Sequence, residues 1–86
     1  MVVDYGFYKR VMEFLAQYLG LANEVLRMDV VDYQETINGV KVLVSIHRLR
    51  NNEVIYCTVN FDNAIGRAEP TCSKDKEYIE KIYREM

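Results

Sequence analysis

The sequence predicts a single small α+β domain of the order α-β-β-β-(β)-α, with an antiparallel meander sheet and both helices packed on one face. Three observations lead to this fold class. Amphipathic segments lie near both ends of the chain, β-branched stretches fill the middle, and Asn38-Gly39 and Asn51-Asn52 separate these stretches. At 86 residues the chain is expected to fold as one domain over 1–86.

The expected first helix begins at Asp4, an N-cap residue, and ends near Leu19. Its apolar residues recur at helical spacing and comprise Phe7, Tyr8, Val11, Phe14, Leu15, Tyr18 and Leu19. Gly20 follows where a left-handed residue ends a helix, and Leu21 can add an apolar contact beyond it. This stripe favours a core-facing helix over the wall of a ligand pocket.

The first two strands are expected to meet at Asn38-Gly39, because both residues tolerate the positive φ of a two-residue type I′ turn. That turn pairs Ile37 with Val40. The resulting core face holds Val31, Tyr33, Ile37, Val40, Val42, Val44 and Ile46. The alternation through 26–30 is out of phase with this set, which predicts a bulge or a bend near Val30-Val31.

The third strand is expected after a turn at Asn51-Asn52, which adds Ile55, Cys57, Val59 and Phe61 to the core face. A short fourth strand over 67–69 would lie at a sheet edge, because Pro70 lacks an N–H and ends it. Ser73 is the expected N-cap of the last helix. That helix is expected to bury Tyr78, Ile79, Ile82, Tyr83 and Met86.

The opposite face of the sheet mixes apolar and polar side chains. It is too polar for a second core and too apolar for a purely solvated surface, so we interpret it as a surface that binds a protein. The residues of this expected partner-binding face are Val30, Leu43, Ser45, His47, Leu49, Val54, Tyr56 and Thr58.

Catalysis is not expected. Asp32, Ser45 and His47 share the partner-binding face, but the acid is expected opposite the serine instead of beside the histidine. No glycine-rich loop offers an oxyanion hole. The single histidine and two cysteines lack the spacing of a metal site, and no cofactor or small-molecule ligand is indicated.

Composition bears on location and redox state. No leader peptide and no apolar stretch of about 18 residues is visible, so the cytoplasm is the expected location. Cys57 and Cys72 are therefore expected to be reduced thiols. A disulfide between them stays open until their Cα separation is known.

Nucleic-acid binding is a less favoured alternative, because the net charge is −2 and the pI is near 5.3. A local patch is the remaining route, through Arg67, Lys74 and Lys76. The order α-β-β-β-α resembles the double-stranded-RNA-binding domain, in which a basic helix start contacts phosphates. That resemblance implies RNA contacts at Lys74 and Lys76, although acidic residues 75 and 77 interrupt the basic run.

The main functional hypothesis is a small non-catalytic protein-interaction module that self-associates, as a homodimer, through its open sheet face or an edge strand. A domain of this size gains stability from oligomerisation, because it buries only about 60% of its unfolded surface alone. Two alternatives stay open: an acidic inhibitor or regulator of a larger protein, and the nucleic-acid-binding domain described above.

Overall fold

The computed structural model describes residues 4–62 and 68–86 of the chain. The elements follow one another as α1 (Tyr5–Tyr18), β1 (Leu26–Glu35), β2 (Gly39–Arg48), β3 (Glu53–Asp62), β4 (Thr71–Ser73) and α2 (Lys76–Glu85). The strands form one open antiparallel sheet in the order β1-β2-β3-β4. The predicted α+β fold with a meander sheet is confirmed.

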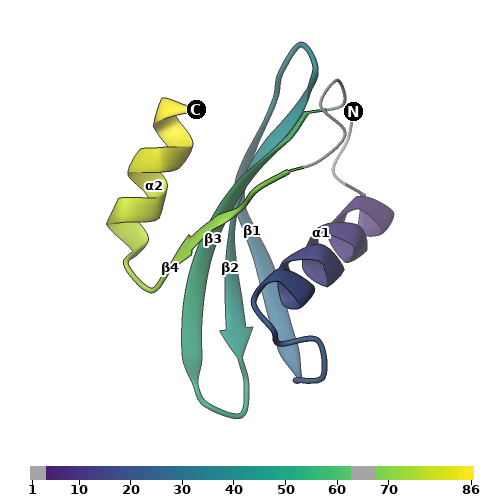
Figure 1. Cartoon of the computed structure of the whole chain (residues 1–86), viewed down its shortest axis with the longest axis vertical. Coiled ribbons are helices and arrows are strands. Elements are labelled where there is room, and N and C mark those ends of the chain that lie inside the picture. Colours follow the sequence, from purple (N-terminus) through teal and green to yellow (C-terminus); the bar gives the residue numbers. More distant parts are fainter. Residues whose placement is uncertain (1–3, 63–67) are drawn as a thin grey trace.

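The two helices lie on opposite faces of the sheet (Figure 1). The α1 face of the sheet, defined by Val42 and Val44, packs on α1 in the larger core. The α2 face, defined by Leu43, packs on α2 in a smaller cluster with Ile79 and Tyr83. The expectation that both helices share one face is therefore wrong. Neighbouring residues of β2 point to opposite faces, so β2 supplies apolar side chains to both helices.

The ends of α1 match the prediction. Asp4 is the N-cap, and its carboxylate accepts a 2.8 Å hydrogen bond from the N–H of Phe7. Gly20 has a φ of +73°, as a left-handed residue after a helix requires. The N–H of Leu21 then donates to the C=O of Ala16 at 2.8 Å, and the Leu21 side chain is buried. This closure turns the chain toward β1.

The turn of the β1–β2 hairpin lies one residue earlier in the sequence than predicted. The N–H of Thr36 donates to the C=O of Gly39 at 2.8 Å, so Ile37-Asn38 occupies the turn. Neither Asn38 nor Gly39 has a positive φ, which rules out the expected type I′ turn at that dipeptide. As a result Val40 pairs with Glu35, and Ile37 lies fully exposed instead of in the core.

The predicted bulge in β1 is confirmed. Val30 pairs with Val44 and Asp32 pairs with Leu43, so Val31 is the extra residue. Because of the bulge, Met28 and Val30 lie on the α1 face and contribute to the larger core. Val31 is 48% exposed, so its predicted place in the core is wrong.

The β2–β3 turn spans residues 49–52, because Arg48 pairs with Glu53. Asn52 adopts a left-handed φ of 52°, which an asparagine tolerates. The register therefore differs by two residues from the one that a two-residue turn at Asn51-Asn52 would set. A shift of two leaves every side chain on its predicted face. Cys57 and Val59 are accordingly buried in the larger core.

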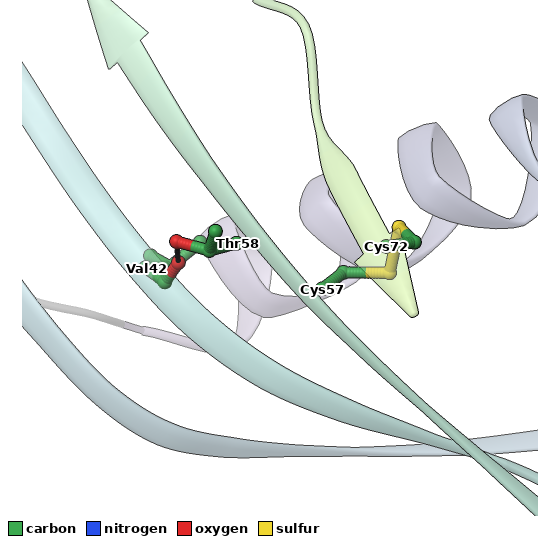
Figure 2. Close-up of a disulfide and its surroundings, with 4 residues drawn as sticks. All are labelled: Val42, Cys57, Thr58 and Cys72. Atoms are coloured by element: carbon green, nitrogen blue, oxygen red, sulfur yellow. Dashed lines mark hydrogen bonds between the residues drawn. A yellow bond between two sulfur atoms is a disulfide. The ribbon is translucent and has the colours of Figure 1, made fainter. Parts of the chain in front are cut away.

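Strand β4 lies after Pro70, not before it. Of the expected strand over 67–69, Ala68 and Glu69 are not in a strand and Arg67 lies outside the described residues. Cys72 in β4 pairs with Cys57 in β3, and a disulfide joins them across a Cα separation of 4.1 Å (Figure 2). The expectation of two reduced thiols is therefore wrong.

Helix α2 begins two residues later than expected. Asp75, not Ser73, is the N-cap, and its carboxylate accepts from the N–H of Tyr78 at 3.2 Å. The Ser73 hydroxyl instead accepts from the N–H of Asp75 at 3.0 Å. In the described part of the chain, no helix is long and apolar enough to span a membrane.

Candidate functional site

Strand β1 forms a long free edge of the sheet (Figure 1). It runs over Leu26–Glu35 and pairs only with β2 among the described strands. The other edge is β4, which has only three residues and follows a proline. Long strand edges bind further strands through their backbone groups, so β1 is the element on which we centre the site.

The direction of the backbone groups along β1 follows from the hydrogen bonds at its two ends. The Thr36–Gly39 hydrogen bond marks a hydrogen-bonded pair, and antiparallel pairs alternate. The backbone N–H and C=O groups of Tyr33 and Glu35 therefore point away from β2. At the other end, the N–H of Leu49 donates to the C=O of Val25 at 3.3 Å, which by the same alternation turns the backbone groups of Met28 outward.

A contact within the chain occupies the first half of the edge. The Tyr8 hydroxyl, on α1, donates to the backbone C=O of Met28. The bulge at Val31 then interrupts the regular repeat of the edge. Such features protect native edges from strand addition. The segment open to a partner is therefore the outer half, residues 31–37.

Apolar side chains mark this outer half. Val31 is 48% exposed, Tyr33 is 43% exposed and Ile37 is 100% exposed. Isoleucine is unusual at this position, because turns favour Gly, Asn, Asp and Pro and because an exposed apolar side chain gains nothing from burial. The N–H of Tyr33 donates to the Asp32 carboxylate at 2.8 Å. A backbone carbonyl of a partner strand would replace the carboxylate as the acceptor. We name residues 31–37 the outer edge.

The sheet face predicted to bind a partner is largely covered by α2. Leu43, Ser45 and Thr58 are buried, and Tyr56 packs against the α2 cluster. The Thr58 hydroxyl donates to the C=O of Val42 at 2.8 Å (Figure 2). These residues therefore do not form an open surface. The expectation of an open face assumed that α2 would lie on the other face.

The remaining residues of the predicted face are separated. Val30 lies on the α1 face and packs against the larger core. Leu49 lies in the β2–β3 turn and is 51% exposed, whereas His47 and Val54 are half-buried near the end of the sheet. The structure therefore does not bring the eight predicted residues together as one binding face.

The polar side chains of Arg27, Asp29 and His47 form a small network. The guanidinium of Arg27 lies 3.4 Å from Nδ1 of His47, and Asp29 lies 3.3 Å from Nε2. Asp29, not Asp32 as predicted, is opposite Ser45 in the register. In the described part of the chain no three His, Cys, Asp or Glu residues are grouped to hold a metal ion.

Of the predicted nucleic-acid contacts, the structure describes Lys74 and Lys76. Lys74 forms a 2.9 Å ion pair with Glu53, which also binds Arg48 at 3.0 Å. The hydrogen bond from Lys74, followed by that from Arg48, lowers the pKa of Glu53. Lys76 is exposed at the start of α2 between two acidic residues, and Arg67 lies outside the described residues. Lys74 is therefore already engaged with a carboxylate.

Helix α2 is anchored by a buried lysine that sequence reasoning missed. Lys41 is 7% exposed, and its ammonium donates to the backbone C=O of Tyr83 at 3.0 Å and of Met86 at 3.2 Å. The ammonium also lies 4.7 Å from the centre of the Tyr83 ring. A cation at the C-terminal end of a helix stabilises the helix dipole. The signal in the sequence was a lysine between the apolar residues Val40 and Val42 of a strand.

Tyr83 places a hydroxyl inside the α2 interface. Within the described residues, this buried hydroxyl makes no hydrogen bond of acceptable geometry. Burial raises the pKa of Tyr83, and the nearby carboxylate of Asp32 raises it further. The interface beneath α2 is thus more polar than the larger core.

A groove of about 470 Å³ lies between the second half of α1 and the chain leading into β1. Its apolar lining includes Met12, Ala16 and Val25. Glu24 at this groove is held by two hydrogen bonds from Arg48, at 2.9 and 2.7 Å. These hydrogen bonds raise the pKa of Arg48. The side chains that line the groove include no histidine, cysteine, serine or lysine.

No family model, curated protein or solved structure matches this chain.

Proposed function

We propose that the chain is a non-catalytic protein-interaction module that binds a partner by strand addition at the outer edge, residues 31–37. The observation that carries this proposal is the exposure of Val31, Tyr33 and Ile37 along a strand that, among the described strands, has a neighbour on one side only. A partner strand would gain backbone hydrogen bonds and would cover these apolar side chains. Nothing in this function requires a cofactor or a metal.

An edge strand replaces the open sheet face as the proposed binding element. In the main hypothesis either could serve, but α2 covers Leu43, Ser45 and Thr58 on the face. The outer edge needs no rearrangement of α2, because β1 and β4 are at opposite sides of the sheet. Binding at the outer edge therefore leaves the fold intact.

The test is a displayed library of extended peptides selected for binding to the chain. We expect the selected peptides to shift the amide resonances of residues 31–37 in an NMR titration. Ile37→Asp should weaken binding roughly tenfold or more, because it places a charge where an apolar side chain is covered. Leu49→Asp is the matched control, since Leu49 is exposed in the opposite hairpin. Peptides that instead map to the groove near Met12 and Ala16 would contradict the proposal.

A second candidate is regulation of a larger protein that supplies a basic strand. The carboxylates of Asp29 and Asp32 lie beside the edge on the α2 face and favour such a partner. Selected peptides enriched in lysine and arginine would support it. Peptides without charge enrichment would leave only the general strand-addition function.

The disulfide bears on where this function takes place. The cytoplasm was the expected location, but disulfides persist mainly in oxidising compartments. The Cys57–Cys72 bond therefore favours an oxidising environment for the folded protein. Counting free thiols in protein purified from its native source, with alkylation at lysis, tests this point.

A further inference from the structure

We infer, building on the proposed strand addition, that the partner strand is the outer edge of a second copy of the chain. The two edges run antiparallel and are centred on Gln34, which lies opposite Gln34 of the second copy. Val31 then lies opposite Ile37 of the second copy, and Tyr33 lies opposite Glu35. The two sheets join into one continuous sheet with a twofold axis through the Gln34 pair.

The backbone alternation of β1 fits this pairing. The N–H and C=O groups of Tyr33 and Glu35 point away from β2, so each faces the outward groups of the other in the second copy. Tyr33 and Glu35 thus form hydrogen-bonded pairs, and Gln34 forms the central non-hydrogen-bonded pair. Only backbone groups of Glu35 enter, so its side chain keeps the contacts that it makes inside the monomer.

The sheet faces and the apolar side chains fit as well. Tyr33 and Glu35 both lie on the α1 face, by their pairing with Val42 and Val40, so like faces meet. Ile37, fully exposed in the monomer, is covered by Val31 of the second copy. No pair of like charges lies directly opposite in this register. The arrangement therefore covers the exposed apolar residues of both copies at once.

Neighbouring twofold registers are less favourable. A centre at Glu35 sets two carboxylates directly opposite each other, which is destabilising. A centre at Tyr33 sets Ile37 opposite Asp29 and leaves it without an apolar partner. Pairing through the whole of β1 with like faces matched sets Asp29 opposite Asp32 of the second copy, twice. Charge thus selects the Gln34-centred register.

Cysteine cross-linking tests this register. The wild-type cysteines are joined to each other, so a new cysteine supplies the only free thiol. In Gln34→Cys the two new Cα atoms would lie about 4.5 Å apart, within reach of a disulfide. In Tyr33→Cys, the matched control, they would lie roughly 8 Å apart and could not be joined. Diamide is the oxidant, and peptide mass spectrometry identifies the bond.

We expect Gln34→Cys to form a covalent dimer of twice 10.1 kDa and Tyr33→Cys to remain monomeric on a denaturing gel. Adding Ile37→Asp to Gln34→Cys should slow cross-linking roughly 10- to 100-fold, whereas adding Leu49→Asp should not. Cross-linking of Tyr33→Cys instead of Gln34→Cys would overturn the register. Wild-type protein that sediments as a monomer at millimolar concentration, together with no cross-linking, would overturn the second copy as partner. Strand addition itself is then judged separately, by the peptide selection.

Discussion

Replacing both cysteines, in the variant Cys57→Ala/Cys72→Ala, should lower the free energy of unfolding by about 3 kcal/mol at 25 °C. The estimate comes from the 15-residue sequence separation of the bonded cysteines, because the bond restricts that loop in the unfolded chain. For a domain of this length, the loss corresponds to a fall in Tm of roughly 12–24 °C. The loss is large relative to the stability of a small domain.

The structure also predicts which elements lose stability when the disulfide is removed. Strand β4 has three residues, and its other links to β3 are the pairs Thr58–Thr71 and Tyr56–Ser73. Helix α2 follows β4 directly and buries only Ile79 and Tyr83. Without the disulfide, β4 and α2 should open more often than β2, so amide exchange should rise most in these two elements.

The assay is urea unfolding followed by circular dichroism, on wild type and on the double variant, each with and without a phosphine reductant. Reduction should destabilise wild type and leave the variant unchanged. This control separates the loss of the bond from the loss of the Cys57 sulfur, which is fully buried. A reduction effect below about 1 kcal/mol would refute the loop-entropy estimate. Two free thiols in native, air-purified protein would refute the bond itself.

Three further substitutions test the α2 interface and the ion pairs. Lys41→Met keeps the aliphatic stem but removes the donor to the end of α2, so stability should fall by about 1 kcal/mol and amide exchange in the last turn of α2 should rise. Tyr83→Phe removes a buried hydroxyl without a good partner, so stability at pH 7 should stay unchanged or rise by up to about 1 kcal/mol. Because the folded-state pKa of Tyr83 is raised, its hydroxyl ionises less readily in the folded chain than in the unfolded chain. Its ionisation therefore has no effect on stability well below pH 10 and lowers stability as pH rises from 10 through the folded-state value. Urea titrations at pH 9–11 should therefore show a smaller alkaline loss for Tyr83→Phe than for wild type. Because the folded-state pKa of Glu53 is lowered, the stability that its ionised carboxylate contributes is present above the ordinary pKa of 4.5 and is lost as pH falls through the folded-state value. Glu53→Gln should therefore reduce the acid-induced loss of stability measured between pH 6 and 3, and an unchanged acid profile would contradict the role of its pairs with Lys74 and Arg48.

Side-chain periodicity made the first helix and the core strands predictable. Phe7, Val11 and Leu15 repeat at helical spacing, and the structure buries all three. The alternation in β2 and β3 was read correctly even though their turn was misplaced, because an error of two residues preserves the faces. The bulge at Val31 was predictable because the alternation changes phase there.

The errors arose where local patterns do not determine the register or the packing. Asn38-Gly39 favours a two-residue turn by composition, but the turn lies one residue earlier, at Ile37-Asn38, and this shift of two in the pairing leaves the faces of β1 and β2 unchanged. Leu43 and Tyr56 lie in strands whose other face was already assigned to a helix, so their role beneath α2 was overlooked. These contacts depend on tertiary packing, which local patterns do not encode.

The disulfide was left open and the limits of the outer edge were not predicted, for a related reason. Placing the fourth strand before Pro70 left Cys72 without a neighbour, whereas a strand after Pro70 brings Cys72 beside Cys57. The outer edge could be suspected from the few guarding residues of β1. Its limits depend on the contact between Tyr8 and Met28, which links α1 to β1 over 20 residues.

The coverage of β2 on both faces has a consequence for the order of events in folding. Val42 and Val44 belong to one cluster and Leu43 to the other, so neither cluster can form before β2 is in place. Both hairpins are local in sequence and share this strand, which favours rapid assembly around it. We therefore expect φ-values near their maximum in β2 and near zero in α2, whose docking needs the completed sheet.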